Sequence, residues 1–158
     1  MAAKQVIIKS EGTQIKANIA NESITPGHLI EFIGGSAATA SQLKKHATAG
    51  GNAQKRFALE QDYIGGTGTA GGALSKTYAS GDEVNYLTAK TGDEINALIK
   101  ASENVGVGSL LESNGDGTLR IHTPASAGAA PVQANRIVAM ALDSSNVGTV
   151  ARVRVEVV

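Results

Sequence analysis

The sequence predicts an all-β protein: a small antiparallel β-sandwich or barrel with long Gly- and Ala-rich loops, an extended N-terminal arm and at most one short helix. In the last ten residues, TVARVRVEVV, small or apolar side chains alternate with Arg152, Arg154 and Glu156. This period of two is typical of a strand with one buried and one charged face. In SLLESNGDGTLRIHT (109–123), two strand-like pieces flank Asn-Gly-Asp-Gly, which predicts a hairpin. Several more short strand-like pieces separated by turn residues favour a sandwich or barrel.

The remaining strands are expected from shorter patterns. Apolar side chains alternate with polar ones at 15–19, and Pro26-Gly27 predicts a turn before the next strand. The run RIVAMAL is continuously apolar, which is typical of a central strand. Further strands are therefore expected within 15–19, 28–33, 55–64 and 136–142.

Two near-copies lie eleven residues apart in the middle of the chain, SGDEVNYL (80–87) and TGDEINAL (91–98). Each begins with the S/T-x-x-E pattern of a helix capping box, and Ile95, Leu98 and Ile99 have helical spacing. Val84 and Tyr86 alternate like a strand, and AKTGD between the copies suits a hairpin turn. The pattern leaves strand and helix open for 92–102.

Three segments are expected to be loops. GGSAATASQ (34–42) and PASAGAAPVQAN (124–135) have no periodicity. Gly66, Gly68 and Gly71 form a literal G-x-G-x-x-G, but the preceding strand is half-polar and too few residues follow for a crossover helix. Ser75 also replaces the glycine that a P-loop requires before its lysine. The glycine run is therefore interpreted as a surface loop.

Composition excludes several classes of protein. The 158 residues include 2 Phe, 3 Tyr and no Trp, and the core of small aliphatic side chains favours stability shared between subunits. Zero net charge argues against nucleic-acid binding, and no stretch is apolar enough to cross a membrane or resemble a signal peptide. The absence of cysteine excludes disulfides and thiolate chemistry.

No residue is predicted to be catalytic, cofactor-binding or metal-binding, and the protein is not expected to be an enzyme. His28, His46 and His122 are scattered without metal-ligand spacing. The acidic pairs after Gly81 and Gly92 are interpreted as turn residues in water.

A resemblance to a known family rests on several segments of the second two-thirds of the chain: YASGDEVNYLTAKTGDEINALI, ENVGVGSLLESNGDGTLRIHT, RIVAMALD and ARVRVEVV. These resemble capsid decoration, or cement, proteins of tailed bacteriophages. The resemblance implies a β-tulip-like domain that sits as a homotrimer on an icosahedral head and clamps the major capsid protein. It also implies a protein made in the host bacterial cytoplasm and located on the outer capsid surface. The alternative is a glycan- or receptor-binding β-sandwich module of a virion or cell surface.

The expected organisation is an arm or first strand at 1–25, followed by a β-rich decoration domain at 26–158. An arm of this kind would pair with a neighbouring subunit by strand addition. The polar face of the last strand is the second candidate surface. Contacts with the capsid or with other subunits are predicted for Lys4, Val6, Ile7, Ile8, Lys9, Arg152, Arg154 and Glu156.

Overall fold

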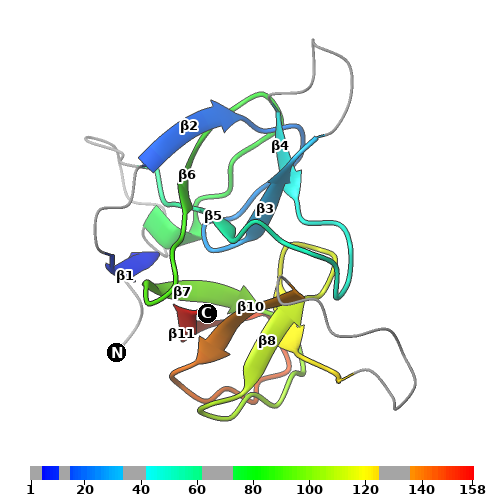
Figure 1. Ribbon diagram of the computed structural model, residues 1–158. Coiled ribbons are helices and arrows are strands. Elements are labelled where there is room, and N and C mark those ends of the chain that lie inside the picture. Colours follow the sequence, from blue (N-terminus) through cyan, green and yellow to red (C-terminus); the bar gives the residue numbers. More distant parts are fainter. Residues whose placement is uncertain (1–4, 11–14, 34–41, 62–72, 125–135) are drawn as a thin grey trace.

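The computed structural model describes residues 5–10, 15–33, 42–61, 73–124 and 136–158 (Figure 1). These residues confirm the all-β fold class, with one 3₁₀ turn as their helical element. The elements are β1 (Ile7–Lys9), β2 (Ile15–Ile19), β3 (Leu29–Phe32), β4 (Leu43–Lys45), β5 (Arg56–Ala58), η1 (Ala73–Ser75), β6 (Glu83–Thr88), β7 (Glu94–Ile99), β8 (Leu110–Ser113), β9 (Leu119–Ile121), β10 (Ile137–Ala141) and β11 (Ala151–Val157).

The strands form two sheets, one above the other in Figure 1. The upper sheet has the order β2-β6-β5-β3-β4, and a parallel bridge between Ala20 and Leu43 joins its two edges. The lower sheet has the order β1-β7-β11-β10-β8-β9, and a parallel pair between Ile99 and Leu119 joins β7 to β9. We call β2–β6 the N-terminal barrel and β7–β11 the C-terminal barrel.

The two barrels have the same topology. In each, the first strand along the chain pairs with the fifth, which pairs with the fourth, then the second and the third. The registers also match, because Glu31 lies opposite Lys44 in one barrel and Glu112 opposite Arg120 in the other. The protein therefore contains two structural copies of one five-stranded unit.

Each barrel buries apolar side chains in its interior, and one further layer lies between the barrels. The N-terminal barrel encloses a cluster that includes Ile30, Ala58 and Tyr86. Their sequence neighbours Leu29, Phe57 and Leu87 point the other way, as strand alternation requires, and belong to the larger cluster that fills the C-terminal barrel. The outer face of the N-terminal barrel is thus packed against its neighbour.

Several strand predictions are confirmed. β8 and β9 pair antiparallel, and Gly115 and Gly117 between them have φ of 89° and 84°, the left-handed region that favours glycine. β10 lies between β8 and β11, as its apolar run predicted, and β11 alternates buried valines with partly exposed polar residues. The alternative left open for 92–102 resolves as strand β7.

The near-copies share a turn but not a place in the barrel. In both, the aspartate accepts a hydrogen bond from the backbone N–H three residues earlier, at 2.7 Å for Asp82 and 2.8 Å for Asp93. β6 is nevertheless the last strand of one barrel and β7 the first strand of the next. The glycine run with Gly66, Gly68 and Gly71 lies outside the described residues, as do the predicted loops apart from Gln42 and Pro124.

Candidate functional site

The predicted contact residues lie mainly on two strands that flank β7 in one sheet. β1 pairs with β7 on one side and β11 pairs with it on the other. Lys9, Glu94 and Glu156 consequently lie in one row across three strands. The structure thus brings together two segments from opposite ends of the chain, while Lys4 lies outside the described residues.

The predicted residues of β1 and its approach differ in what they expose. Val6 is fully buried in the larger core cluster, and its backbone N–H donates to Glu60 Oε2 at 2.9 Å. Ile7 packs partly against the same cluster. Ile8 is 38% exposed and Lys9 is exposed, so these two side chains are the ones that β1 presents at the surface.

The polar residues of β11 also differ in whether they lie at the contact between the barrels or at the surface. Arg152 Nη2 donates to the carbonyl of Leu74 at 2.6 Å, and burial lowers the pKa of this guanidinium while Glu60 opposes that shift. Arg152 therefore belongs to the contact between the barrels. Arg154 lies 3.3 Å from Asp143 at the surface, and Glu156 is partly exposed. The assignment of these residues to capsid or subunit contacts remains a prediction.

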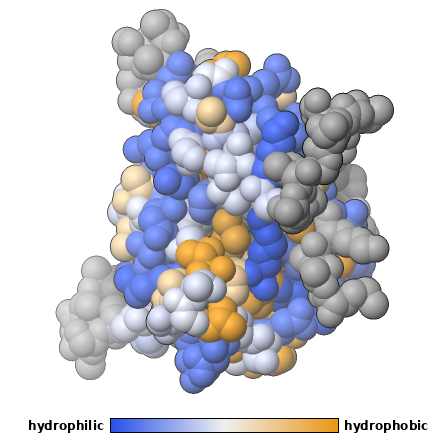
Figure 2. Space-filling view, turned by 180° about the vertical axis from the view of Figure 1, so that it is seen from behind, coloured by the Kyte–Doolittle hydropathy of each residue, from blue (hydrophilic) through white to orange (hydrophobic). Residues whose placement is uncertain are grey.

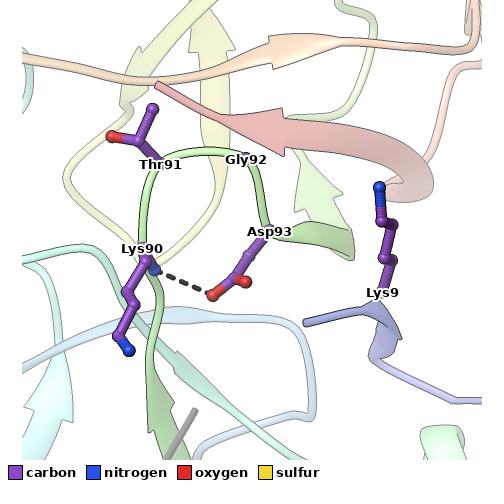
Figure 3. Close-up of a pocket in the computed structure, with 5 residues that line it drawn as sticks. All are labelled: Lys9, Lys90, Thr91, Gly92 and Asp93. Carbon is purple, nitrogen blue, oxygen red and sulfur yellow. Dashed lines mark hydrogen bonds between the residues drawn. The ribbon is translucent and has the colours of Figure 1, made fainter. Parts of the chain in front are cut away.

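A surface hollow of about 310 Å³ lies beside β1, lined by Lys9, Lys90, Thr91, Gly92 and Asp93. Figure 3 shows the turn before β7 on one side of this hollow and Lys9 on the other. The carboxylate of Asp93 accepts from the backbone N–H of Lys90, so it holds the turn in place. The hollow places charges of both signs next to the exposed part of β1.

One ionic cluster was missed at the sequence level. Glu112 is fully buried, and its carboxylate accepts from Arg120 Nη2 at 2.7 Å and lies 2.7 Å from His122 Nδ1. Burial raises the pKa of Glu112, but the hydrogen bonds with His122 and Arg120 outweigh this and hold the pKa below its usual value. The register of the predicted hairpin would have placed Glu112 opposite Arg120.

The N-terminal barrel carries the same arrangement in a more exposed form. Glu31 pairs with Lys44 at 3.2 Å and lies 3.8 Å from His46. His46 itself is buried, and its ring nitrogens lie 2.8 Å from Ser113 Oγ and 3.0 Å from the carbonyl of Asn52. The contact with Ser113 on β8 ties the first barrel to the second, which is a structural role.

His28 also has a structural role, in the turn before β3. Its Nδ1 accepts a hydrogen bond from the backbone N–H of Thr25 at 3.0 Å. Burial, and then the charge of Lys45, lower the pKa of His28 to about 4. Within the described residues, no group of three or more His, Asp or Glu side chains is arranged to hold a metal ion. No helix in those same ranges is long and apolar enough to span a membrane.

The comparisons with known proteins show a similarity in structure and none in sequence. No family model matches the sequence, and no curated protein matches it. Among solved structures, the chain is similar to the N base of the head fiber gp8.5 of bacteriophage phi29, with a TM-score of 0.53 and 13% sequence identity. The match covers 92% of this chain and 98% of that one, so both proteins share the fold over nearly their whole length.

Proposed function

We propose that this protein is a virion structural protein that binds the outer surface of an icosahedral phage head as a homotrimer and stabilises the capsid. Its partners are the major capsid protein and its own copies, and it is made in the cytoplasm of the host bacterium. The proposal is supported by the fold shared with the base of a phage head fiber over 92% of this chain. The proposed function requires surfaces that bind neighbouring subunits and involves no chemical reaction.

The exposed part of β1 is the surface we propose for the capsid. Within the described ranges, β1 is an edge strand that has a strand partner, β7, on one side. An edge strand offers backbone groups to which a neighbouring chain adds a strand. Ile8 and Lys9 flank this edge at the surface, beside the hollow formed with Asp93.

Mixing the purified protein with undecorated phage heads tests the proposal. We expect binding that saturates at a fixed ratio and heads that withstand a higher temperature, because a ligand that binds only the assembled head stabilises it by mass action. Failure to bind heads under any condition contradicts the proposal. Binding to a cell-surface glycan instead would favour a receptor-binding module.

Substitutions locate the capsid surface more sharply than truncation does. Removing residues 1–12 would also remove Val6 from the core and so destabilise the fold. The double variant Ile8→Asp, Lys9→Glu changes only surface side chains, and we expect head binding to weaken by ~10-fold or more. The single variant Lys9→Glu has the same change of charge as Lys100→Glu at the other end of β7, which is its matched control and should bind heads like the wild type. Equal losses in both variants would show that the effect is general electrostatics.

A further inference from the structure

We infer that the C-terminal barrel of one copy docks onto the N-terminal barrel of the next copy, by the contact that joins the two barrels within one chain. The inference rests on the proposed self-association and names its two surfaces. One is the turn 106–109 with Leu110, and the other is β2. Each is the unoccupied counterpart of a surface that is buried inside the chain.

The internal contact centres on the turn 25–28 before β3. The backbone N–H of Leu98 on β7 donates to the carbonyl of Gly27 at 3.1 Å. A Cβ added to Gly27 would lie 2.5 Å from Arg152 Nη1 and 2.9 Å from the carbonyl of Asn96. Pro26 and Leu29 on either side are buried. The turn is therefore pressed closely against the C-terminal barrel.

The turn 106–109 before β8 has the same construction. Gly108 has φ of 84° against 89° for Gly27, and its N–H donates to the carbonyl of Ala141 at 2.8 Å, as that of Gly27 donates to Ala58 at 2.7 Å. Ser109 Oγ accepts from the N–H of Gly106 at 3.2 Å, which is the role of His28 in the first turn.

The second turn is open where the first is covered. Among the described residues, nothing lies within 4 Å of a Cβ added to Gly108. Val107, at the place of Pro26, is 71% exposed, and Leu110, at the place of Leu29, is 41% exposed. Seen from behind, hydrophobic side chains gather on the lower half of the molecule, which is the half of the C-terminal barrel (Figure 2).

β2 is the counterpart of β7, and the described part of the chain likewise leaves it uncovered. The matched registers place Ile19 where Leu98 stands and Ile15 where Glu94 stands. Leu98 is buried beneath the Gly27 turn, whereas Ile19 is 38% and Ile15 61% exposed. Among the described residues, the N–H of Ile19 donates to the side chain of its neighbour Asn18, at 2.8 Å. In the inferred contact this N–H donates to the carbonyl of Gly108 in the next copy.

A second copy is the partner that fits both surfaces at once. Each copy carries one open turn and one open β2, so a contact between them is heterologous and leaves the same pair of surfaces free at the ends. Such contacts propagate until a ring closes. In the proposed trimer, three copies close the ring and cover the apolar side chains that the single chain exposes.

Light scattering on single variants tests the inference. We expect Leu110→Asp and Ile19→Asp each to weaken self-association by ~30-fold or more, because each places a charge in an apolar contact. The mass should then fall to the 16.0 kDa of one chain. Val150→Asp, at an apolar side chain that is 49% exposed and outside both surfaces, is the matched control and should keep the wild-type mass. Thermal unfolding of each variant checks that the chain remains folded.

Mixing the two variants separates this contact from other modes of association. The Leu110→Asp chain retains an intact β2, and the Ile19→Asp chain retains an intact turn. A heterologous contact predicts that the mixture forms a pair of one chain each and stops there. A wild-type oligomer that neither substitution weakens, or a mixture that stays monomeric, overturns the inference but leaves the proposed capsid function standing.

Engineered thiols test the contact on heads, should copies associate only there. The sequence has no cysteine, so Ile19→Cys with Gly108→Cys introduces the only two thiols. A Cβ on Gly27 would lie 3.4 Å from Leu98 Cγ, which places the equivalent thiols within disulfide range. We expect linked oligomers from the double variant and none from either single variant. No linkage on saturated heads would refute the contact, while head binding itself remains a separate readout.

Discussion

The two barrels share one topology, yet they achieve stability in different ways. At four matched interior positions the C-terminal barrel has apolar side chains where the N-terminal barrel has polar ones. The matched registers set Lys16, Asn18, Arg56 and Thr88 at the places of Ile95, Ala97, Ala139 and Val157. The interior of the N-terminal barrel therefore buries fewer apolar side chains than the interior of the C-terminal barrel.

The N-terminal barrel compensates with ring contacts and with its outer face. Phe32 meets Tyr86 edge-on at 6.0 Å, and the guanidinium carbon of Arg56 lies 4.5 Å from the centre of the Phe32 ring. On the outside, Leu29, Phe57 and Leu87 are buried against the other barrel. The comparison teaches that two barrels with the same strand order can bury their stabilising side chains at different places. Substitutions at equivalent positions test this directly.

The largest difference in the free energy of unfolding is expected between substitutions of Leu29 and of Leu110. Both are leucines at the same place in the repeat. Leu29→Ala should cost ~3–4 kcal/mol, because Leu29 is fully buried and its loss leaves a cavity. Leu110→Ala should cost less than ~1 kcal/mol in the dissociated chain, because Leu110 is 41% exposed. Urea unfolding measures both. Equal costs would show that the two outer faces are equally packed.

The next largest difference in stability loss is expected between substitutions of the two glutamates that lie opposite basic residues. Glu112→Gln should cost ~2–3 kcal/mol, because it leaves Arg120 and His122 without their buried carboxylate. Glu31→Gln should cost less than ~1 kcal/mol, because its pair with Lys44 is near the surface. The shift of the urea midpoint at constant slope measures each cost. A small loss for Glu112→Gln would contradict a stabilising role for the cluster.

The paired glycines separate conformational strain from close packing. Gly108→Ala should cost ~1 kcal/mol, the penalty of a side chain at positive φ. Gly27→Ala adds a clash with Arg152 and the Asn96 carbonyl and should cost ~2 kcal/mol. Thermal unfolding of both variants in the monomeric state provides the comparison. If Gly27→Ala is no worse than Gly108→Ala, the contact between the barrels is looser than described.

The smallest effect concerns pH and the turn residues His28 and Ser109. The folded-state pKa of His28, about 4, lies below the ordinary histidine value of 6.5, so the unfolded chain binds more protons between these values. This contribution to stability is fully present above pH 6.5 and is lost as the pH falls toward 4. Between about pH 7 and about pH 5 we expect a loss of ~1–2 kcal/mol.

The variant His28→Ser copies the chemistry of Ser109 and removes the titrating group. Its unfolding free energy should change less over the same pH interval than that of the wild type. Glu112 and Asp116 have lowered pKa values, so their stabilisation is lost only at lower pH, in both proteins. Parallel pH profiles for the two proteins would exclude His28 as the source of the loss.

Local sequence patterns are sufficient to predict the strands and turns. The hairpin around Asn114–Gly117 and the alternation of β11 depend on neighbouring residues, so they were read directly from the sequence. The repeat was not visible, because the matched positions differ in residue type, as Ile95 and Lys16 do. The visible near-copies 80–87 and 91–98 pointed instead to adjacent strands of different barrels.

The predicted contact surface also shows what local patterns predict and what they leave open. The apolar run at Val6, Ile7 and Ile8 was recognised as a unit, but Val6 is part of the core and Ile8 is not. Arg152 and Arg154 looked equivalent on one strand face, yet Arg152 reaches Leu74 in the other half of the chain. Such differences in burial depend on which distant segment of the chain packs over each side chain.

The sequence by itself determined the all-β class, the positions of the turns and the alternation within strands, because these follow from the backbone preferences and the period of neighbouring residues. Only the tertiary structure decided that the ten barrel strands form two copies of one unit and that Leu29 is covered while Leu110 is exposed. Burial between barrels is a property of pairs of distant surfaces. A leucine at the same place of either copy carries no information about which surface has found its partner.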